Sequence, residues 1–391
     1  MIRKIFFLTI STFNQRDFKR FGIELLEKNG FCVEVWDFTN ILFPHIARNH
    51  NLPGLINWSG HKVFKDKKHA LKNLEDLDSD TLIITFMPYN PKFYSIYKAI
   101  FTSDAKYAPF CANAYPSVKA TKKKKIEKLL YNLKKLQKNP FNNLINYTFL
   151  KVPSSWARLK PPALILAGGM ESLRYQPPTD QSTEILWIHA LDYDLYLEEK
   201  NEPSAEKPTA VFLDEYLPSH PDFFRYNIPP PIESDKYYPL LNRLFTLIEQ
   251  QLKLKIIIAA HPRSHYEDLS DLFEGREGIH GQTVKLVKES RLVLAHTSNA
   301  INFANLFCKP VIFLTSLGLN KSHIGAKIRE TASLFGKKPV YLDRDFKIDW
   351  DSELKVSMVH YESYLHNYIK TDYSEELPFW QIVANRLKKE L

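Results

Sequence analysis

Short apolar runs alternate with amphipathic segments along most of the chain, and this alternation limits the folds that it can adopt. Residues 4–10 (KIFFLTI) are typical of a buried strand, 15–29 of an amphipathic helix, and 31–37 (FCVEVWD) of a second strand. A strand–helix–strand start favours a parallel sheet. Further runs at 81–87 and 163–167 are short and end in polar or glycine sequence, as strands covered on both faces do. The pattern therefore predicts an α/β fold.

The alternation is interrupted at 200–208 (KNEPSAEKP), a polar, proline-bearing stretch that is typical of a linker or long loop. Beyond it we predict strands at 209–213, 254–260, 283–287, 291–295 and 310–314, and helices at 236–252, 264–273 and 298–307.

A chain of 391 residues favours two domains. We predict an N-terminal Rossmann-like domain over 1–200, a C-terminal domain over 205–345, and helices over 350–391 that pack back toward the first domain. The last helix is predicted within the amphipathic stretch PFWQIVANRLKKEL.

The net charge indicates which classes of ligand are compatible with the chain, and the cysteines indicate its cellular compartment. The formal net charge of +9 suits phosphate-bearing ligands or an anionic membrane surface. Cys32, Cys111 and Cys308 lie in apolar sequence without CxxC spacing, which predicts reduced core residues of a cytoplasmic protein. The apolar start of the chain is short and lacks a small-residue cleavage site, so we read it as a first strand rather than a signal peptide.

A lysine-rich stretch at 118–139 has leucines and an isoleucine at helical spacing opposite its basic residues. One interpretation is a solvated helix packed through its leucines. The other is a membrane-surface helix, because anionic headgroups attract each nearby lysine by about 1 kcal/mol. No nucleic-acid motif is present, so a nucleic-acid partner is not expected. The membrane interpretation places the protein peripherally at the inner face of the cell membrane and depends on Lys122, Lys123, Lys124 and Lys125.

His261-Pro262-Arg263 follows the apolar run 254–260, where the strand is predicted to end. Ligands of open α/β sheets bind beyond the carboxyl ends of the strands. An imidazole, a guanidinium and the amides of a helix predicted to begin at Ser264 all suit phosphate oxygens. The alternative is a histidine that caps the loop and an arginine in a surface ion pair.

His296-Thr297-Ser298 ends the predicted strand 291–295 and opens the next helix. Hydroxyls and free amides at a helix start bind anions, although Thr-Ser alone is more often a helix cap. Together with the His-Pro turn on a neighbouring strand, this second site favours one pocket for a nucleotide's negative charge.

Carboxylates form the third candidate site. Asp214-Glu215 ends the strand 209–213, and His220 and Asp222 follow in the same loop. Such carboxylates act as nucleophile, base or acid where a cleft shifts their pKa, or else they cap the loop. Weaker candidates for the substrate cleft are Gly168, Gly169, His189, Asp192 and Asp194. The spacing of Asp192 and Asp194 is compatible with a divalent metal, but a helix start explains it equally well, so no metal is expected.

The sequence IIAAHPR followed by RLVLAHTSNAINFANLFCKPVIFL resembles the nucleotide-binding half of GT-B glycosyltransferases. More narrowly, it is similar to bacterial surface-polysaccharide enzymes that use CMP-activated acidic sugars, the sialyltransferases and β-Kdo transferases. The resemblance covers mainly 205–320. It implies two facing Rossmann-like domains, a CMP-linked donor and a glycan or lipid-linked glycan acceptor of the lipopolysaccharide or capsule type. It implies no cofactor and no metal.

By this resemblance, His261-Pro262 and Thr297-Ser298 would hold the phosphate and ribose of CMP. Asp214, as first choice, or Glu215 would act on the sugar's anomeric centre or on the acceptor hydroxyl. The predicted nucleotide-sugar-binding residues are His261, Pro262, Arg263, His296, Thr297, Ser298 and Asn299. Two alternatives stay open: a UDP-sugar 2-epimerase, and a non-catalytic scaffold that has kept the fold.

Overall fold

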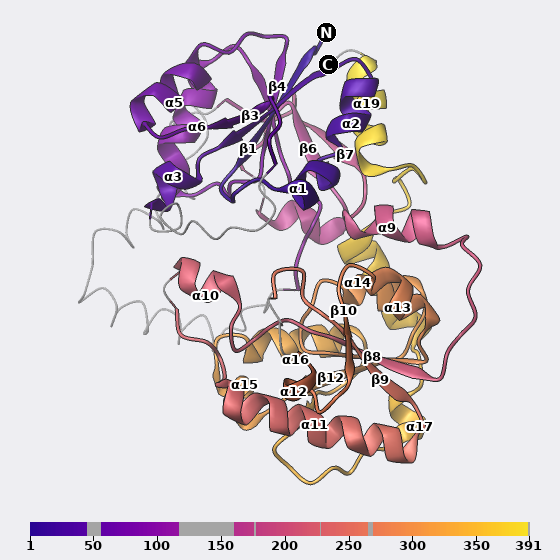
Figure 1. Cartoon of the computed structure of the whole chain (residues 1–391). Helices are drawn as coiled ribbons and strands as arrows, with labels where there is room; N and C mark the ends of the chain where they lie inside the picture. Colours follow the sequence, from indigo (N-terminus) through magenta and orange to yellow (C-terminus); the bar gives the residue numbers. More distant parts are fainter. Residues whose placement is uncertain (45–55, 117–159, 176, 227, 265–268, 390–391) are drawn as a thin grey trace. The chain divides into compact units, whose positions relative to one another are not determined.

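A computed structural model describes residues 1–44, 56–116, 160–175, 177–226, 228–264 and 269–389 (Figure 1). The chain divides into two compact units. Unit 1 comprises Met1–Ala114, Lys119–His189 and Lys370–Leu391, and unit 2 comprises Tyr115–Val118 and Ala190–Ile369. The polar stretch 200–208 lies within unit 2, and residues 370–391 belong to unit 1.

The sheet of unit 1 is parallel and has the strand order β3-β2-β1-β4-β5. A parallel bridge between Phe110 and Leu166 places β6 beside β5, and β7 pairs with β6. The strands are β1 (Lys4–Thr9), β2 (Cys32–Asp37), β3 (His61–Val63), β4 (Thr81–Thr85), β5 (Lys106–Pro109), β6 (Leu164–Ala167) and β7 (Glu184–Trp187).

The helices of unit 1 include one from residues 370–391. The α-helices are α1 (Gln15–Arg20), α2 (Ile23–Lys28), α3 (Thr39–Leu42), α5 (Lys67–Glu75), α6 (Tyr94–Thr102) and α19 (Phe379–Lys388), and the 3-10 turns are Pro91–Phe93 and Met170–Tyr175. On α19, the Trp380 indole N–H donates to the carbonyl of Arg20 (2.7 Å), and its ring meets the ring of Phe7 edge-on at 5.0 Å. The C-terminal helix is therefore part of the unit 1 core.

The single helix predicted over 15–29 is wrong, because α1 and α2 are separate helices. Gly22 lies between them with φ of +58°, a conformation that favours glycine. A Cβ on Gly22 would clash with the indole ring of Trp380, so a glycine here also makes room for α19.

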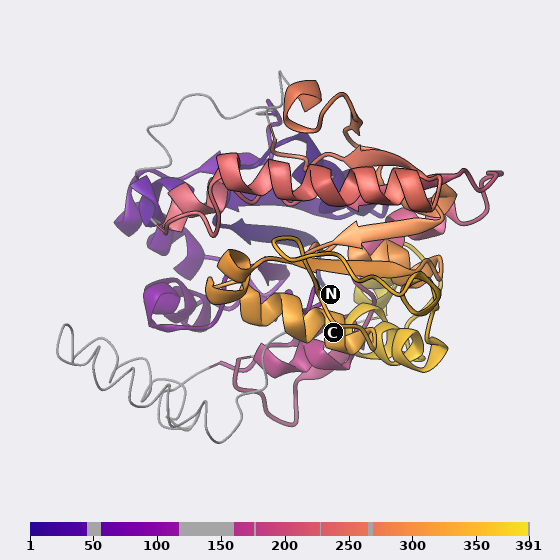
Figure 2. The ribbon, with the colours of Figure 1, turned by 90° about the horizontal axis from the view of Figure 1, so that it is seen from below.

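The sheet of unit 2 is also parallel, with the strand order β10-β9-β8-β11-β12-β13. Counted along the chain this is 3-2-1-4-5-6, the order of dinucleotide-binding sheets, in which the direction of winding reverses between the first and fourth strands. Figure 2 shows α11 on one side of this sheet and α16 on the other. The strands are β8 (Thr209–Leu213), β9 (Lys255–Ala259), β10 (Glu277–Ile279), β11 (Leu292–Ala295), β12 (Val311–Thr315) and β13 (Val340–Tyr341).

Helices alternate with these strands, as the sequence predicts for an α/β unit. The longest, α11, buries one face against the sheet, with the Phe245 and Phe212 rings 5.3 Å apart. The α-helices are α9 (Asp192–Glu199), α10 (Pro221–Tyr226), α11 (Ser234–Gln251), α12 (Leu269–Leu272), α13 (Thr283–Glu289), α14 (Ile301–Leu306), α15 (Leu317–Lys321), α16 (Gly325–Leu334), α17 (Trp350–Glu353) and α18 (Met358–Tyr364), and α18 runs into the π-helix Leu365–Ile369.

Three predictions for unit 2 need correction. Residues 283–287 form part of α13, not a strand. Short apolar runs do not distinguish strand from helix, and the crossover from β10 to the parallel strand β11 requires a helix. Ser264 lies in a turn, with its N–H bonded to the carbonyl of His261, and the described helical part of 264–273 is α12. The helix predicted over 298–307 begins at Ile301.

The cysteine prediction is also partly wrong. Cys32 and Cys308 are exposed and Cys111 is half-buried, and none forms a disulfide. Cys32 is the first residue of β2, and Cys308 follows α14 with φ of +51°, so both lie at element ends rather than in the core. Among the described helices, none has the length and apolarity needed to cross a bilayer.

Candidate functional site

Four loops of unit 2 begin at the same edge of its sheet. They follow the carboxyl ends of β8, β9, β11 and β12, and parallel strands place these ends together. The reversal of winding lies between β8 and β11, where ligands of such sheets bind. The predicted residues Asp214, Glu215, His261 and Thr297 all follow these strands directly or within two residues.

Asp214 joins the β8 loop to the β9 loop. Its carboxylate accepts the backbone N–H of Tyr216 at 2.9 Å and that of His261 at 3.4 Å. Only 4% of Asp214 is exposed. These two hydrogen bonds to a buried carboxylate fix the β8 and β9 loops relative to one another.

Glu215 makes the corresponding link on the other side of β8. One carboxylate oxygen accepts the backbone N–H of Thr297 at 2.5 Å, and the other accepts the Thr297 hydroxyl at 2.9 Å. The pair bridges β8 and β11 across the reversal of winding. Glu215 is half-buried, whereas Asp214 is buried, so Glu215 is the more accessible of the two carboxylates.

A second cluster lies on the β9 side of Asp214. The imidazole rings of His220 and His261 meet edge to face with centroids 4.9 Å apart. The Arg263 guanidinium lies 3.2 Å from an Asp222 carboxylate oxygen and 3.3 Å from Nε2 of His220. The β8 and β9 loops therefore present two imidazoles, a guanidinium and a carboxylate together.

The hydrogen-bonding positions of the His220 ring cannot all be satisfied by protein groups. Its Nδ1 accepts the backbone N–H of Asp222 at 3.2 Å, which places the proton of a neutral ring on Nε2. That N–H then faces Arg263, which has only donors. Burial lowers the pKa of His220, and Arg263 lowers it further, while Asp222 and Glu215 oppose this change. An anionic oxygen near Nε2 and the guanidinium would accept from both.

His296 is in the core rather than at the site surface. It is fully buried, and its Nδ1 donates to the carbonyl of Leu314 at 2.7 Å, so Nε2 accepts the Tyr237 hydroxyl at 3.0 Å. Burial lowers its pKa, which favours the neutral ring that this bonding requires. Because both ring nitrogens are bonded to protein groups, His296 links the end of β11 to β12 and α11 and has no ring nitrogen left for a ligand.

The other predicted residues of the His-Pro and Thr-Ser loops are at or near the surface. Pro262 and Asn299 are exposed, and Ser298 is half-buried. The Ser298 hydroxyl accepts the backbone N–H of Ala300 at 3.3 Å, and the Asn299 amide donates to the hydroxyl of Tyr115 at 2.7 Å. Ser298 therefore caps the turn before α14, and Asn299 orients the ring of Tyr115.

Three of the weaker candidates, Gly168, Gly169 and His189, belong to unit 1. Gly168 and Gly169 form a buried turn in unit 1, closed by the Gly168 N–H and the Ser172 hydroxyl at 3.0 Å. His189 is a buried residue of unit 1 whose Nε2 lies 2.9 Å from the carbonyl of Leu377.

Asp192 and Asp194 lie in the first turn of α9, where acidic residues favour the helix dipole. Asp192 accepts the Asn302 amide at 3.1 Å and so ties α9 to α14. No group of three metal-ligating side chains occurs in the described part of the chain.

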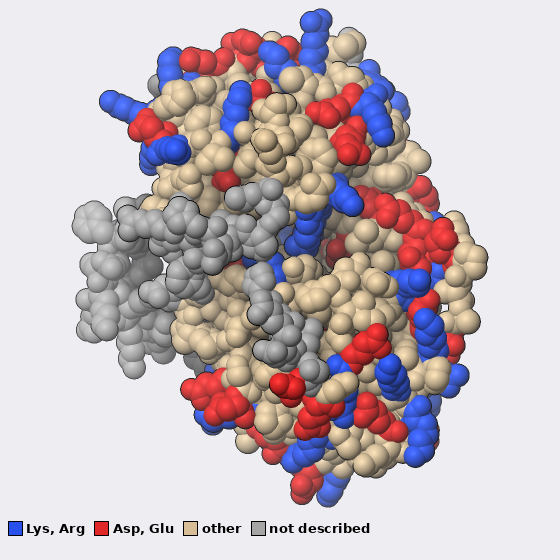
Figure 3. Space-filling view, in the orientation of Figure 1, with Lys and Arg blue, Asp and Glu red and all other residues tan. Residues whose placement is uncertain are grey.

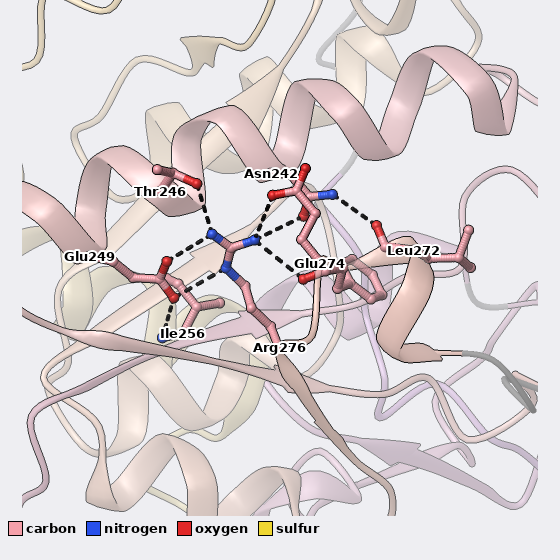
Figure 4. A network of polar contacts seen from close by, with 8 residues as sticks. Asn242, Thr246, Glu249, Ile256, Leu272, Glu274 and Arg276 are labelled. Carbon is pink, nitrogen blue, oxygen red and sulfur yellow. Dashed lines mark hydrogen bonds and ion pairs between the residues drawn. The ribbon is translucent and has the colours of Figure 1, made fainter.

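Arg276, which no sequence pattern marks, anchors the segment between β9 and β10 at the end next to β10. Its guanidinium binds both carboxylate oxygens of Glu249 on α11, at 2.7 and 3.1 Å (Figure 4). It also binds the Thr246 hydroxyl at 2.9 Å, and Asn242 holds the carbonyl of Leu272 at 2.9 Å. A bidentate arginine–carboxylate pair with a largely buried guanidinium makes a rigid anchor for β10.

Lys327 was also missed. It lies in the first turns of α16, and its ammonium is 4.9 Å from the centre of the Tyr115 ring. Burial lowers its pKa, and Glu215 acts in the opposite direction. Nothing in the local sequence KSHIGAKIRE marks this lysine, because only the fold brings it near the β11 loop.

Charges of both signs are interspersed on each unit over the face shown in Figure 3, with no broad basic area on its coloured atoms. Lys122, Lys123, Lys124 and Lys125, on which the membrane interpretation depends, lie outside the described residues.

No family model and no curated protein matches the sequence. Solved structures do resemble the fold. The S. aureus MnaA–UDP co-structure has a TM-score of 0.50 and 13% sequence identity, with 99% of this chain and 96% of that chain covered. The glycotransferase of kitacinnamycin has a TM-score of 0.51 and 9% identity, with both chains fully covered.

These similarities and the two parallel α/β units confirm the predicted GT-B-type fold with two Rossmann-like units.

Proposed function

We propose that this chain is a nucleotide-sugar-dependent glycosyltransferase. The observation that carries the proposal is the placement of Asp214-Glu215 at the reversal of winding of the unit 2 sheet. Asp214 is bonded to the loop of His261, and Glu215 to Thr297. One dipeptide thus holds both loops that the sequence assigns to a nucleotide. The fold, shared with a structure that contains UDP, agrees with this assignment.

In this proposal His261, Arg263 and His220 bind the phosphate of the donor. Transfer breaks the bond between the anomeric carbon and the phosphate oxygen, and the electron pair leaves with the phosphate. Donors that are already in place stabilise this charge without reorganisation. The two donors that face one another at His220 and Arg263 would both point to one phosphate oxygen.

The two carboxylates have separate roles in the proposal. Glu215 takes the proton of the acceptor hydroxyl as the new glycosidic bond forms. Asp214, more deeply buried and bonded to two backbone N–H groups, positions the loops. This order reverses the sequence-based preference, because the structure makes Glu215 the more accessible carboxylate.

The finer assignment is a CMP-activated acidic 2-keto sugar, of the Kdo or sialic-acid kind, transferred to a lipopolysaccharide- or capsule-type glycan. It is supported by the resemblance of 205–320 to enzymes of that kind. Peripheral contact with an anionic membrane through Lys122, Lys123, Lys124 and Lys125 belongs to the same proposal. A variant with glutamine at these four positions should sediment less with anionic vesicles, and equal sedimentation would remove the membrane contact.

A UDP-sugar 2-epimerase is the second candidate. It is favoured by the number of acid–base groups gathered at one place, with Glu215, Asp222, His220 and His261 around two neighbouring strand ends. An epimerase needs several such groups about one sugar and no acceptor.

Binding of nucleotides separates these functions. Thermal unfolding and calorimetry are measured with CMP, UDP and GDP for the wild-type protein and for His261→Ala. We expect CMP to raise the Tm, and His261→Ala to weaken CMP binding about tenfold while the unliganded Tm stays unchanged.

Each other outcome has a definite meaning. Stabilisation by UDP alone, with a change of configuration at C2 of a UDP-sugar seen by NMR, favours the epimerase. Binding of none of the three nucleotides favours the scaffold. Equal CMP affinity in a folded His261→Ala protein removes His261 from the site.

A further inference from the structure

Lys327 is a partly buried lysine of unit 2 whose charge is not matched by a close partner. Within the described part of the chain, no carboxylate lies within 4.0 Å of its ammonium, and no protein group accepts a hydrogen bond from it. Burial lowers its pKa, which reflects the cost of holding an ammonium away from water.

A short chain of contacts connects Lys327 to the candidate site. Its ammonium lies 4.9 Å from the centre of the Tyr115 ring, and the Tyr115 hydroxyl accepts the side-chain amide of Asn299 at 2.7 Å. Asn299 is two residues beyond Thr297, which Glu215 holds through both carboxylate oxygens. Lys327 therefore lies on the β11–β12 side of Glu215, and Arg263 lies on the β9 side.

The surroundings of the Lys327 ammonium compensate its charge only in part. The ring of Tyr115 supplies a cation–π contact, which is weaker than an ion pair at close range. Glu215 attracts the ammonium but does not form a close ion pair with it. Tyr115 is 48% exposed, so this group of residues is reached from solvent. An oxyanion brought to the ammonium would supply the missing partner.

We propose that Lys327, with Asn299 and Tyr115 beside it, binds an oxyanion of the donor, separately from the oxyanion held by His261 and Arg263. The inference rests on the proposed function. A donor that suits both positions carries two separated negative groups. They are two phosphates, or one phosphate and the carboxylate of an acidic sugar.

The test compares Lys327→Met with Lys327→Arg and with Lys321→Met, which removes one exposed lysine charge from the end of α15. Calorimetry gives Kd values for cytidine, CMP, UDP and a CMP-linked acidic sugar. We expect Lys327→Met to weaken binding of UDP or of the CMP-linked acidic sugar about tenfold and to leave binding of cytidine and CMP unchanged. Lys327→Arg should keep most of the affinity, and Lys321→Met should match the wild type. Tm values confirm that each variant is folded.

The pattern across probes identifies the source of the oxyanion. Loss with CMP itself places Lys327 at the phosphate already assigned to His261 and Arg263 and overturns the second position, whereas loss with UDP but not CMP assigns Lys327 to the second phosphate. Loss only with the CMP-linked acidic sugar assigns it to the sugar carboxylate. If Lys327→Met binds every probe as Lys321→Met does, the inference is overturned while the proposed function stands. If the wild-type protein binds no probe, the proposed function fails and this inference fails with it.

Discussion

In unit 1 the residues that follow β4 and β5 are phenylalanines, and in unit 2 the residues that follow β8 are carboxylates. The rings of Phe86 and Phe110 lie 4.6 Å apart, and Phe86 stacks on Phe21 at 4.7 Å. The carboxylates of Asp214 and Glu215 instead bind groups that are 47 and 82 residues away along the chain.

Polar groups at the strand ends of unit 1 bind mainly within their own loops. Thr85 accepts the N–H of Met87 at 3.1 Å, and Asp37 accepts that of Thr39 at 2.7 Å. The Asp37 carboxylate also lies 3.8 Å from Nε2 of His61 on the next strand.

Stacked rings tolerate small shifts, whereas hydrogen bonds lose strength quickly when their geometry changes. The loops of unit 2 are therefore fixed relative to one another in a way that those of unit 1 are not. A site that stabilises developing charge needs this rigidity. The strand ends of unit 2 thus have the rigidity that the proposed function requires, whereas those of unit 1 do not.

The largest effect is expected for Glu215→Gln. The amide keeps one oxygen as an acceptor for Thr297 but cannot take a proton, so turnover should fall by roughly 10²–10⁴. The measurement is nucleotide release from the donor identified by binding. Glu233→Gln, which removes an exposed carboxylate paired with Lys236, is the matched control and should stay at the wild-type rate. A Glu215→Gln protein with full turnover would contradict the role of base.

A smaller effect is expected for Phe86→Leu in unit 1. Loss of the stacked ring should lower the free energy of unfolding by about 1–2 kcal/mol in urea titrations. Nucleotide affinity, measured in the same preparation, should not change, because the described residues proposed to bind nucleotide all lie in unit 2. A loss of affinity with intact stability would show that the strand ends of unit 1 also contribute to nucleotide binding.

The smallest effect is on the pH dependence of stability and concerns His296. Burial lowers its pKa, so the folded protein keeps the ring neutral while the unfolded chain takes up a proton below about pH 6.5. The free energy of unfolding should thus be fully retained above that pH and fall as the pH falls, by at most about 1.4 kcal/mol per pH unit.

His296→Gln should flatten this dependence between pH 7.5 and 5.5, and His323→Gln, at an exposed position, should leave it unchanged. Identical slopes in His296→Gln and the wild type would show that another group is responsible.

Much of the unit 2 site was predictable because position along a strand determines it. Polar residues that follow a fully apolar strand lie at the sheet edge, so the sequence alone places His261, Arg263, Thr297 and Glu215 at that edge. The alternation predicts a parallel sheet but not its strand order, and the segment 283–287, predicted as a strand but helical, shows where the length of an apolar run fails.

The rest depended on contacts that no local pattern encodes. His296 and its neighbour Thr297 are both predicted to bind the nucleotide, but His296 lies in the core, bonded to the carbonyl of Leu314 and the hydroxyl of Tyr237. Lys327 and Tyr115 are more than 200 residues apart in the numbering, and their approach follows from tertiary packing. Arg276 is one of many charged residues until the fold buries it against Glu249.

The inclusion of 370–391 in unit 1 affects how the protein is made. Trp380 and Phe379 pack against Phe7 and Phe110, so unit 1 lacks part of its interior until residues 379 and 380, which follow unit 2 in the chain, are translated. Unit 2 is almost continuous from Ala190 to Ile369. The backbone N–H of Ala190 donates to the carbonyl of Ile369 at 2.7 Å, so the two ends of this segment are joined. During synthesis the second half of the chain can thus reach its native state before the first, which must wait with an exposed aromatic surface.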